Sequence, residues 1–388
     1  MQVHQLFLSC DWGTSSLRIR LVETASLRVI AEECCDKGIR DTYLLWKDSG
    51  EADAGKRIAF YLDRIGESIR NLAGRLSVSL EGVPLLLSGM ASSSAGMAEL
   101  PYRALPFLID RDELITRSIP AGKDFSHPVL LISGLTNGRD VMRGEEVQLI
   151  GCLQGGMPGR AAAGQSDGGK GYAPGGSAGE KGDASGDREV GASAGDGLYI
   201  FPGTHSKHIL VKERAIVDFT TYMTGEFFGL LSQHSLLSGS VEAAPELPSE
   251  DAMRSFRQGV LDAVGTNLLH VAFRVRTNDL FGTLSKKENF HYLSGLLIGT
   301  ELQALAGGND GGRGRAGSDR EGGEENNRVG GLSPLPAVYL CCGAGLKEPY
   351  ERALEALGLY NGVHIFSADL VDTAVVSGQS FIFNQNRK

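Results

Sequence analysis

The sequence contains no long hydrophobic run. No stretch approaches the ~20 apolar residues that a transmembrane helix needs. The first apolar run, Leu6–Leu8, is short and is soon followed by Asp11. A secretory signal would need a basic start and a longer apolar segment. We therefore expect no contact with a membrane and a location in the cytoplasm.

Cysteine spacing typical of metal sites is also missing. The sequence has no Cys-x-x-Cys spacing, and its six cysteines are Cys10, Cys34, Cys35, Cys152, Cys341 and Cys342. Two adjacent pairs fit neither a zinc site nor a disulfide framework. Cys10, Cys341 and Cys342 lie in apolar stretches typical of strands, so we expect them to be buried thiols.

Positive charge is in deficit, with 38 Lys and Arg against 47 Asp and Glu and a formal net charge of −9. This balance, without a dense basic run, disfavours binding to nucleic acid. The hydrophobic fraction of 41% is ordinary for a globular protein, and 388 residues exceed the usual size of one domain. Two domains are therefore expected.

Large apolar side chains are nearly absent from residues 154–196 and from about 306–333. Both segments consist mainly of Gly, Ala, Ser and charged residues, which cannot bury enough apolar surface to offset the cost of ordering the chain. We interpret them as Gly-rich, disordered surface insertions. The N-terminal domain would then span 1–153 and the C-terminal domain 197–388, with the second insertion inside it.

The rest of the sequence has a mixed pattern of strands and helices. Short apolar runs predict strands at 5–10, 17–23, 83–87, 198–201, 208–211 and 337–342. Helical spacing of apolar residues predicts helices at 58–76, 145–152, 290–306 and 348–357. A strand, a polar glycine turn and a second strand occur near the start of each domain. Such a duplication is expected for two related domains that bind one nucleotide between them.

The first turn reads Cys10-Asp11-Trp12-Gly13-Thr14-Ser15-Ser16. Gly13 permits close backbone approach, and the N–H groups and hydroxyls of Thr14 and Ser15 can hold phosphate oxygens. Asp11 at the strand end can organise hydrated Mg²⁺ beside them. The alternative is a plain hairpin turn, because Asp-x-Gly often forms an Asx hydrogen bond.

The second turn, Phe201-Pro202-Gly203-Thr204-His205-Ser206-Lys207, repeats this chemistry. We assign Gly203, Thr204 and His205 to the nucleotide. His205 and His208 have a spacing that metal ligands can have, but the two side chains need not face the same way. No third ligand is evident, so a metal site is not expected there.

A third glycine segment, Gly343-Ala344-Gly345, follows the strand at 337–342. A dinucleotide fingerprint would need another small residue where Glu348 stands, which excludes that fold. A glycine shelf against a nucleobase remains compatible, and we assign Gly343, Ala344 and Gly345 to the nucleotide.

Six ordered blocks resemble the 2-dehydro-3-deoxygalactonokinase family. They are Asp11–Ser15, Ser88–Met90, Val141–Gly151, Pro202–His205, Met223–Glu226 and Leu293–Gly299. The resemblance covers nearly the whole chain except the two insertions, which the compact family lacks. It implies membership of the actin/hexokinase/sugar-kinase superfamily. The expected fold is α/β, with two ribonuclease-H-like domains and with ATP and substrate in the cleft between them.

The resemblance also implies a reaction, the ATP- and Mg²⁺-dependent phosphorylation of 2-dehydro-3-deoxy-D-galactonate to the 6-phosphate. In this superfamily a Gly-Gly-Asp-type element at a helix start supplies the catalytic base, and Arg143-Gly144-Glu145-Glu146 resembles it. Glu145 is then the base, with Glu146 as the alternative. Both glutamates also suit a helix N-terminus for purely structural reasons.

We assign the substrate pocket to Gly89, Ser94 and Arg143, because an anionic sugar acid needs a cation such as Arg143. Two alternatives stay open. A kinase for another sugar or sugar acid would share these motifs. A non-catalytic sugar-responsive regulator of the same fold would carry an added DNA-binding module, for which the first predicted strand leaves no room at the N-terminal end.

Overall fold

A computed structural model of the chain describes residues 5–154, 195–244, 249–306, 336–360 and 362–387. Its strands are β1 Leu6–Trp12, β2 Leu17–Glu23, β3 Val29–Cys35, β4 Leu85–Gly89, β5 Arg103–Ala104, β6 Phe107–Leu108, β7 Thr116–Ile119, β8 Val129–Ile132, β9 Leu135–Thr136, β10 Val141–Met142, β11 Gly197–Phe201, β12 Ser206–Lys212, β13 Ala215–Tyr222, β14 Val338–Leu340 and β15 Val363–Ile365. The predicted insertions fall almost entirely outside the described residues.

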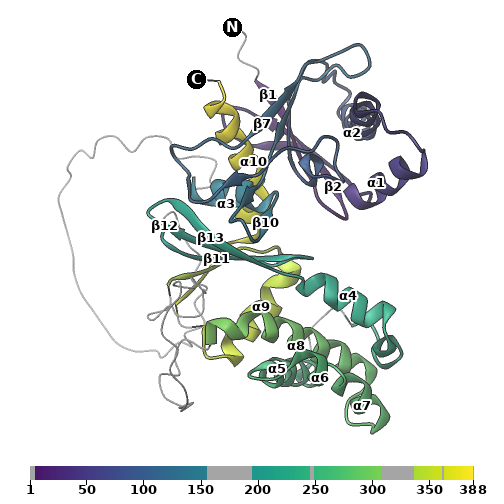
Figure 1. Cartoon of the computed structure of the whole chain (residues 1–388), viewed down its shortest axis with the longest axis vertical. Helices are drawn as coiled ribbons and strands as arrows, with labels where there is room; N and C mark the ends of the chain where they lie inside the picture. The colour runs from purple at the N-terminus through teal and green to yellow at the C-terminus, as the bar shows by residue number, and fades with distance from the viewer. Residues whose placement is uncertain (1–4, 155–194, 245–248, 307–335, 361, 388) are drawn as a thin grey trace, which may run out of the picture.

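The helices surround and separate two six-stranded sheets (Figure 1). They are α1 Ile39–Asp48, α2 Ala54–Leu76, α3 Glu145–Leu153, α4 Thr224–His234, α5 Glu250–Ala263, α6 Leu268–Val271, α7 Arg274–Leu280, α8 Lys286–Ala306, α9 Ala344–Ala356 and α10 Ala368–Gln385, with short 3₁₀ turns at Met90–Ser92 and Leu236–Ser240. No helix among the described residues is long and apolar enough to cross a membrane.

Both sheets contain the same five-stranded unit. The first sheet has the order β3-β2-β1-β4-β8-β7 and the second β15-β14-β11-β12-β13-β6. In each unit the first three strands are antiparallel neighbours, and the last two run parallel to the first. This order, 3-2-1-4-5, is the ribonuclease-H-like arrangement, and its duplication gives the actin-like architecture. The predicted fold class is confirmed.

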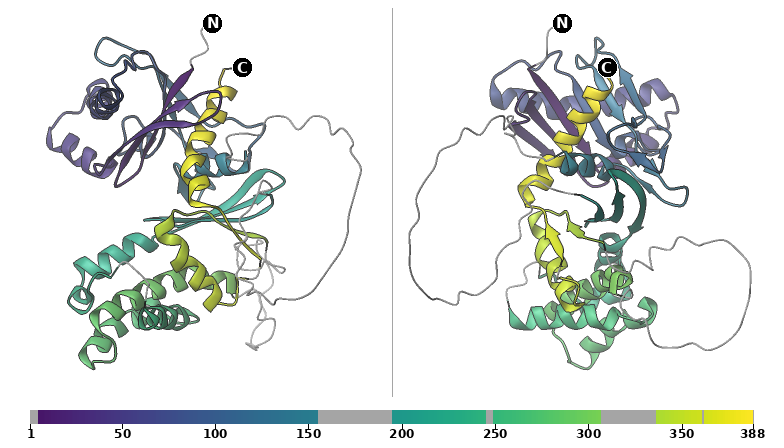
Figure 2. Two further views of the ribbon diagram at one scale, coloured as in Figure 1. Left: turned by 180° about the vertical axis from the view of Figure 1, so that it is seen from behind. Right: turned by 90° about the vertical axis from the view of Figure 1, so that its left-hand side faces the viewer.

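Helices cover both sheets, and two of them lie between the sheets (Figure 2). Side chains of β1 alternate, so that Phe7 packs toward the space between the sheets and Leu8 packs toward α2 on the outer face. Helices α5, α8 and α9 cover the outer face of the second sheet. The space between the sheets is filled by α3 and α10 together with apolar residues of both inner faces.

Helix α10 comes last in the chain and packs against the first sheet and α3. Gln379 donates hydrogen bonds to the Cys10 carbonyl oxygen and to Ser88 Oγ, both at 2.8 Å. Sequence analysis placed this segment in a C-terminal domain at 197–388. The contacts join it to the N-terminal sheet, and the domain boundaries stay a prediction.

The stretch between β4 and α3 connects the two sheets at one side. β6 pairs with β13 and extends the second sheet, although its residues precede α3 in the chain. β5, β9 and β10 form a small separate sheet. In the turn between β9 and β10, Asn137 Nδ2 donates to Asp218 Oδ1 at 2.7 Å and to the Phe219 carbonyl oxygen at 2.9 Å.

Candidate active site

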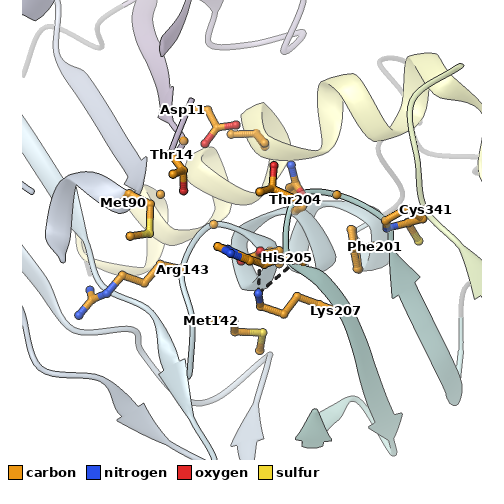
Figure 3. A pocket seen from close by; sticks show the side chains of 18 of the residues that line it. Asp11, Thr14, Met90, Met142, Arg143, Phe201, Thr204, His205, Lys207 and Cys341 are labelled. Carbon is orange, nitrogen blue, oxygen red and sulfur yellow. Dashed lines mark hydrogen bonds and ion pairs between the residues drawn. The ribbon is translucent and has the colours of Figure 1, made fainter. Parts of the chain in front are cut away.

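A cleft of about 660 Å³ opens between the two sheets, where both glycine turns meet the start of α3. Figure 3 shows Asp11 and Thr14 on one side of it, and Thr204, His205 and Lys207 on the other. Of the residues assigned from sequence, those that line the cleft are Asp11, Gly13, Thr14, Ser15, Gly89, Arg143, Glu145, Gly203, Thr204, His205 and Gly343. Glu146, Ser94 and Gly345 do not belong to this lining.

The first glycine turn joins β1 to β2. β1 extends through Trp12, two residues beyond the predicted end of the strand, and the Gly13 N–H donates to the Ser16 carbonyl oxygen at 2.9 Å. Asp11 is therefore held within the strand, where it pairs with Arg18 of β2 and Ser88 of β4. Burial raises the pKa of its carboxyl to about 6, although Arg20 lowers the pKa.

Gly89 lies beside Asp11 at the end of β4. Its φ of +85° favours glycine, and a Cβ there would lie 2.7 Å from the Trp12 carbonyl oxygen and 3.1 Å from Asp11 Oδ1. Gly144 has a φ of +111°, which also favours glycine, and a Cβ there would lie 3.4 Å from the Gly89 Cα. The start of α3 therefore lies close to Gly89, at the end of β4.

The second glycine turn is supported by α4. The Glu226 N–H donates to the Thr204 carbonyl oxygen at 3.0 Å, and a Cβ on Gly225 would lie 2.7 Å from the Gly203 carbonyl oxygen. The His205 ring contacts Glu226, whereas His208 lies 2.9 Å from Glu301 on the opposite face of the sheet. The two histidines thus face different ways. No three metal-ligating side chains converge in the part of the chain that the structure describes.

The two adjacent glutamates of α3 have different surroundings. Glu145 faces the cleft, and its Oε2 is buried without a hydrogen-bond partner among the described residues. Glu146 is 1% exposed, and both its carboxylate oxygens accept the Gly144 N–H at 2.9 Å. Burial, and secondarily the charge of Glu145, raise the pKa of Glu146 to about 8. Glu146 therefore caps the helix start, and Glu145 is presented to the cleft.

Arg143, assigned to the substrate, is largely buried at the wall of the cleft. Its Nη1 donates to Ser92 Oγ at 2.7 Å and its Nη2 to the Leu100 carbonyl oxygen at 2.6 Å. The guanidinium carbon lies 3.9 Å from the centre of the Tyr102 ring. Nε is buried without a partner among the described residues. Ser94, also assigned to the substrate, is exposed, and its carbonyl oxygen accepts a hydrogen bond from Arg57.

The third glycine segment is partly a helix and not a turn. α9 begins at Ala344, with Gly343 as its N-cap, whereas sequence analysis began the helix at Glu348. The predicted start was late because the glycines at 343 and 345 are typical of a turn. Because α9 starts earlier, Pro349 lies inside the helix. Gly343 lines the cleft, whereas Gly345 does not.

Lys207 is the main cleft residue that the sequence analysis missed. Its Nζ lies 3.4 Å from Glu145 Oε1 and donates to the His205 carbonyl oxygen at 3.3 Å, and its side chain is 6% exposed. The predicted strand began at His208, which left Lys207 in a turn. The observed β12 begins at Ser206, and alternation along it turns Lys207, Ile209 and Val211 toward the space between the sheets. Other unassigned residues of the lining include Arg18, Arg20, Tyr102, Asp140, Gln148 and Asp372.

Comparisons with known proteins agree on one family. The family described as 2-keto-3-deoxy-galactonokinase matches residues 11–166 and 188–377. A 2-dehydro-3-deoxygalactonokinase of Escherichia coli K12 is 30% identical over 357 residues, which cover 91% of this chain and 90% of the relative. A probable 2-dehydro-3-deoxygalactonokinase of Rhizobium meliloti is 28% identical, with the same coverage.

A solved structure shares the fold over nearly its full length. The crystal structure of a Sinorhizobium meliloti protein, assigned as a 2-dehydro-3-deoxygalactonokinase, has a TM-score of 0.65 at 22% identity. The match covers 98% of this chain and 96% of the Sinorhizobium meliloti chain. With the family match extending over most of the chain, this chain belongs to the 2-keto-3-deoxy-galactonokinase family and is a carbohydrate kinase.

Proposed function

We propose that the protein transfers the γ-phosphoryl group of ATP to 2-dehydro-3-deoxy-D-galactonate and forms the 6-phosphate. The family and the names of its curated relatives point to this substrate. The observation that carries the proposal is Glu145, because its Oε2 is a buried acceptor without a partner among the described residues, in a cleft between two glycine turns. A sugar hydroxyl could donate to that oxygen.

The residues of the cleft fit ATP and Mg²⁺. A volume of about 660 Å³ lies within the usual ~300–1,000 Å³ of small-molecule sites. Thr14 and Thr204 bring a hydroxyl from each sheet to the same space. Asp11 adds the carboxylate beside which a hydrated Mg²⁺ binds, since Mg²⁺ usually takes one or two carboxylates together with phosphate oxygens. We assign Gly343 to the nucleobase end.

When bound here, ATP supplies the phosphoryl group, and Mg²⁺ screens the charge of its phosphates. The turns at Gly13–Ser16 and Pro202–His205 hold the phosphates from opposite sides. Glu145 accepts the proton of the attacking hydroxyl as transfer proceeds, because a sugar hydroxyl is too weakly acidic to ionise beforehand. Approach of the two sheets would exclude water that could otherwise be phosphorylated in place of the sugar.

The sugar acid carries its carboxylate and its 6-hydroxyl at opposite ends of the carbon chain. If the hydroxyl lies at Glu145, the carboxylate must lie elsewhere along the wall. Arg143 suits this role, because Ser92, Leu100 and Tyr102 fix its guanidinium while Nε keeps an N–H without a partner among the described residues.

A coupled assay of ADP release tests the proposal. We expect turnover with 2-keto-3-deoxy sugar acids, and little with aldonic acids or neutral sugars that lack the keto group or the carboxylate. Faster turnover with a neutral sugar would show instead a kinase of the same fold with another substrate. ATP consumption that no sugar or sugar acid stimulates would contradict the proposal altogether.

A further inference from the structure

Lys207 holds a buried positive charge at the point where the two sheets approach each other. The residue comes from β12 of the second sheet, and its partner Glu145 comes from α3, which packs on the first. The ammonium lies 3.4 Å from one oxygen of Glu145 and 3.3 Å from the carbonyl oxygen of His205 in the second glycine turn (Figure 3). It therefore lies between the proposed base and the proposed phosphate loop.

The other cations of the cleft lining have partners other than Glu145. Arg20 Nε pairs with Glu32 Oε2 at 2.5 Å, and Arg18 Nη1 lies 3.5 Å from Asp372. Arg143 is held by Ser92, Leu100 and Tyr102. Among the described residues, Lys207 alone forms an ion pair with Glu145, the proposed base.

The ion pair places Lys207 and one oxygen of Glu145 at the point where the acceptor hydroxyl and the transferring phosphoryl group would meet. A buried Lys without a partner would be unfavourable, so the ammonium can leave Glu145 only if another anion takes its place. The transferring phosphoryl group is such an anion, because it must lie between the base and the phosphate loop.

We propose that Lys207 is a catalytic residue that leaves Glu145 and donates hydrogen bonds to the oxygens of the phosphoryl group in transfer. This inference rests on the proposed function. The acceptor oxygen forms a bond to the γ-phosphorus, the bond from that phosphorus to the ADP oxygen breaks, and the hydroxyl proton passes to Glu145. Lys207 keeps its protons and stabilises the charge spread over the transferring oxygens.

Recognition of the substrate carboxylate is the competing role for a lysine in this cleft. The position disfavours it. A cation within 3.4 Å of the base lies beside the reacting hydroxyl, and the carboxylate is at the far end of the sugar acid. Arg143 also lines the cleft, and its Nε has no partner among the described residues, so it is the better candidate for the carboxylate.

Calorimetry separates the two roles without relying on turnover. Lys207→Met should weaken binding of the non-hydrolysable ATP analogue AMPPNP with Mg²⁺ about 10- to 100-fold, the effect of one lost hydrogen bond to a charged group. Binding of MgADP, which lacks the γ-phosphoryl group, should change less than about 2-fold. In kinetics, kcat should fall about 10²- to 10³-fold with the KM for the sugar acid nearly unchanged. Lys212→Met, an exposed lysine of the same strand, is the control and should match the wild type.

Equal losses for AMPPNP and ADP, or a raised KM for the sugar acid at an unchanged kcat, would overturn the assignment. If Lys207→Met does not fold, the ratio of AMPPNP affinity to ADP affinity can be measured on Lys207→Gln and Lys207→Arg. This ratio should fall in Lys207→Gln and should fall less in Lys207→Arg. Failure of the wild type to consume ATP with any sugar acid would instead count against the proposed function. A wild type that turns over, with a Lys207→Met variant equal to it, would count against Lys207 alone.

Discussion

At the scale of residues, the site depends on a division of roles between neighbours. Successive side chains of a helix point about 100° apart, so Glu145 and Glu146 cannot both face the cleft. The Gly144 N–H binds the Glu146 carboxylate and turns that side chain inward, which leaves Glu145 for the cleft.

Glu145→Gln should remove most turnover, by about 10²- to 10⁴-fold, because an amide cannot accept the hydroxyl proton. MgADP and sugar-acid affinities should stay within a few-fold of the wild type, since the amide keeps size and polarity. Steady-state kinetics and calorimetry on the same preparation measure both. Turnover that survives in Glu145→Gln but is lost in Glu146→Gln, with binding retained, would assign the base to Glu146.

Glu146 should make stability depend on pH. Its pKa rises from the ordinary 4.5 to about 8 on folding. Between these values the unfolded chain has released the proton that the folded chain keeps, so the free energy of unfolding falls as pH rises, by up to ~1.4 kcal/mol per pH unit. Glu146→Gln should lose this dependence and become more stable than the wild type near pH 8. Urea unfolding at pH 5.5 and 8 measures this.

The matched control is Glu99→Gln, which changes an exposed glutamate and should keep the slope of the wild type. A Glu146→Gln variant with the same slope as the wild type would show that another group causes the dependence.

At the scale of elements, glycine decides how closely α3 and α10 pack. A Cβ on Gly151 would lie 1.8 Å from the Ala374 carbonyl oxygen, and one on Gly378 would lie 2.0 Å from the Val147 carbonyl oxygen. These distances are far below van der Waals contact. The two helices therefore touch backbone to backbone in the layer beneath the cleft.

Gly151→Ala should destabilise the protein by at least ~1–3 kcal/mol, because the helices must move apart. The matched control is Gly74→Ala in α2, where a Cβ meets nothing within 4 Å, so the substitution should be neutral or stabilising by up to ~1 kcal/mol. Thermal melting of both variants tests this. A Gly151→Ala variant that melts like the wild type would mean that the helices can separate at little cost.

Sequence patterns located the elements whose signal is local. The strand at 17–23, the helix ending at Leu76 and both glycine turns were predicted, since periodicity and turn residues define them. The start of α9 was wrong, because the glycines at 343 and 345 favour a turn. The inward direction of the Lys207 side chain was missed, because the predicted strand lacked its first two residues, Ser206 and Lys207. The packing of α10 on the first sheet follows from tertiary contacts that no local pattern encodes.

At the scale of the whole molecule, the two sheets are joined at the side formed by residues 103–142. β6 adds to the second sheet, and the turn after β9 binds β13 through Asn137. Asp140 in the same turn accepts from the Thr221 N–H at 2.6 Å. Any closing movement of the cleft should therefore pivot about this side.

Asn137→Ala should weaken this connection, because it removes the two hydrogen bonds to β13 and the two that Asn137 Oδ1 accepts from the Arg139 and Asp140 N–H groups. The expected loss is ~1–3 kcal/mol, seen as a melting temperature lower by several degrees. Asn71→Ala, which removes a single exposed contact of 3.5 Å, is the control and should have little effect. A melting temperature of Asn137→Ala equal to that of the control would show that these hydrogen bonds contribute little to the connection between the sheets.

The place of α10 has a consequence for the order in which the protein can be assembled during synthesis. The hydrogen bond from Gln379 to Cys10 joins residues 369 positions apart, and α10 supplies part of the apolar cover for Phe7, Val22 and Leu86. Domains made first usually fold first as the chain leaves the ribosome. Here the inner face of the first sheet stays partly uncovered until α10 has been translated. Contacts of such long sequence separation also slow folding. The strands β1, β2 and β4 are made well before α10 and are thus buried late, and over that interval their apolar face is open to chaperones or to another nascent chain.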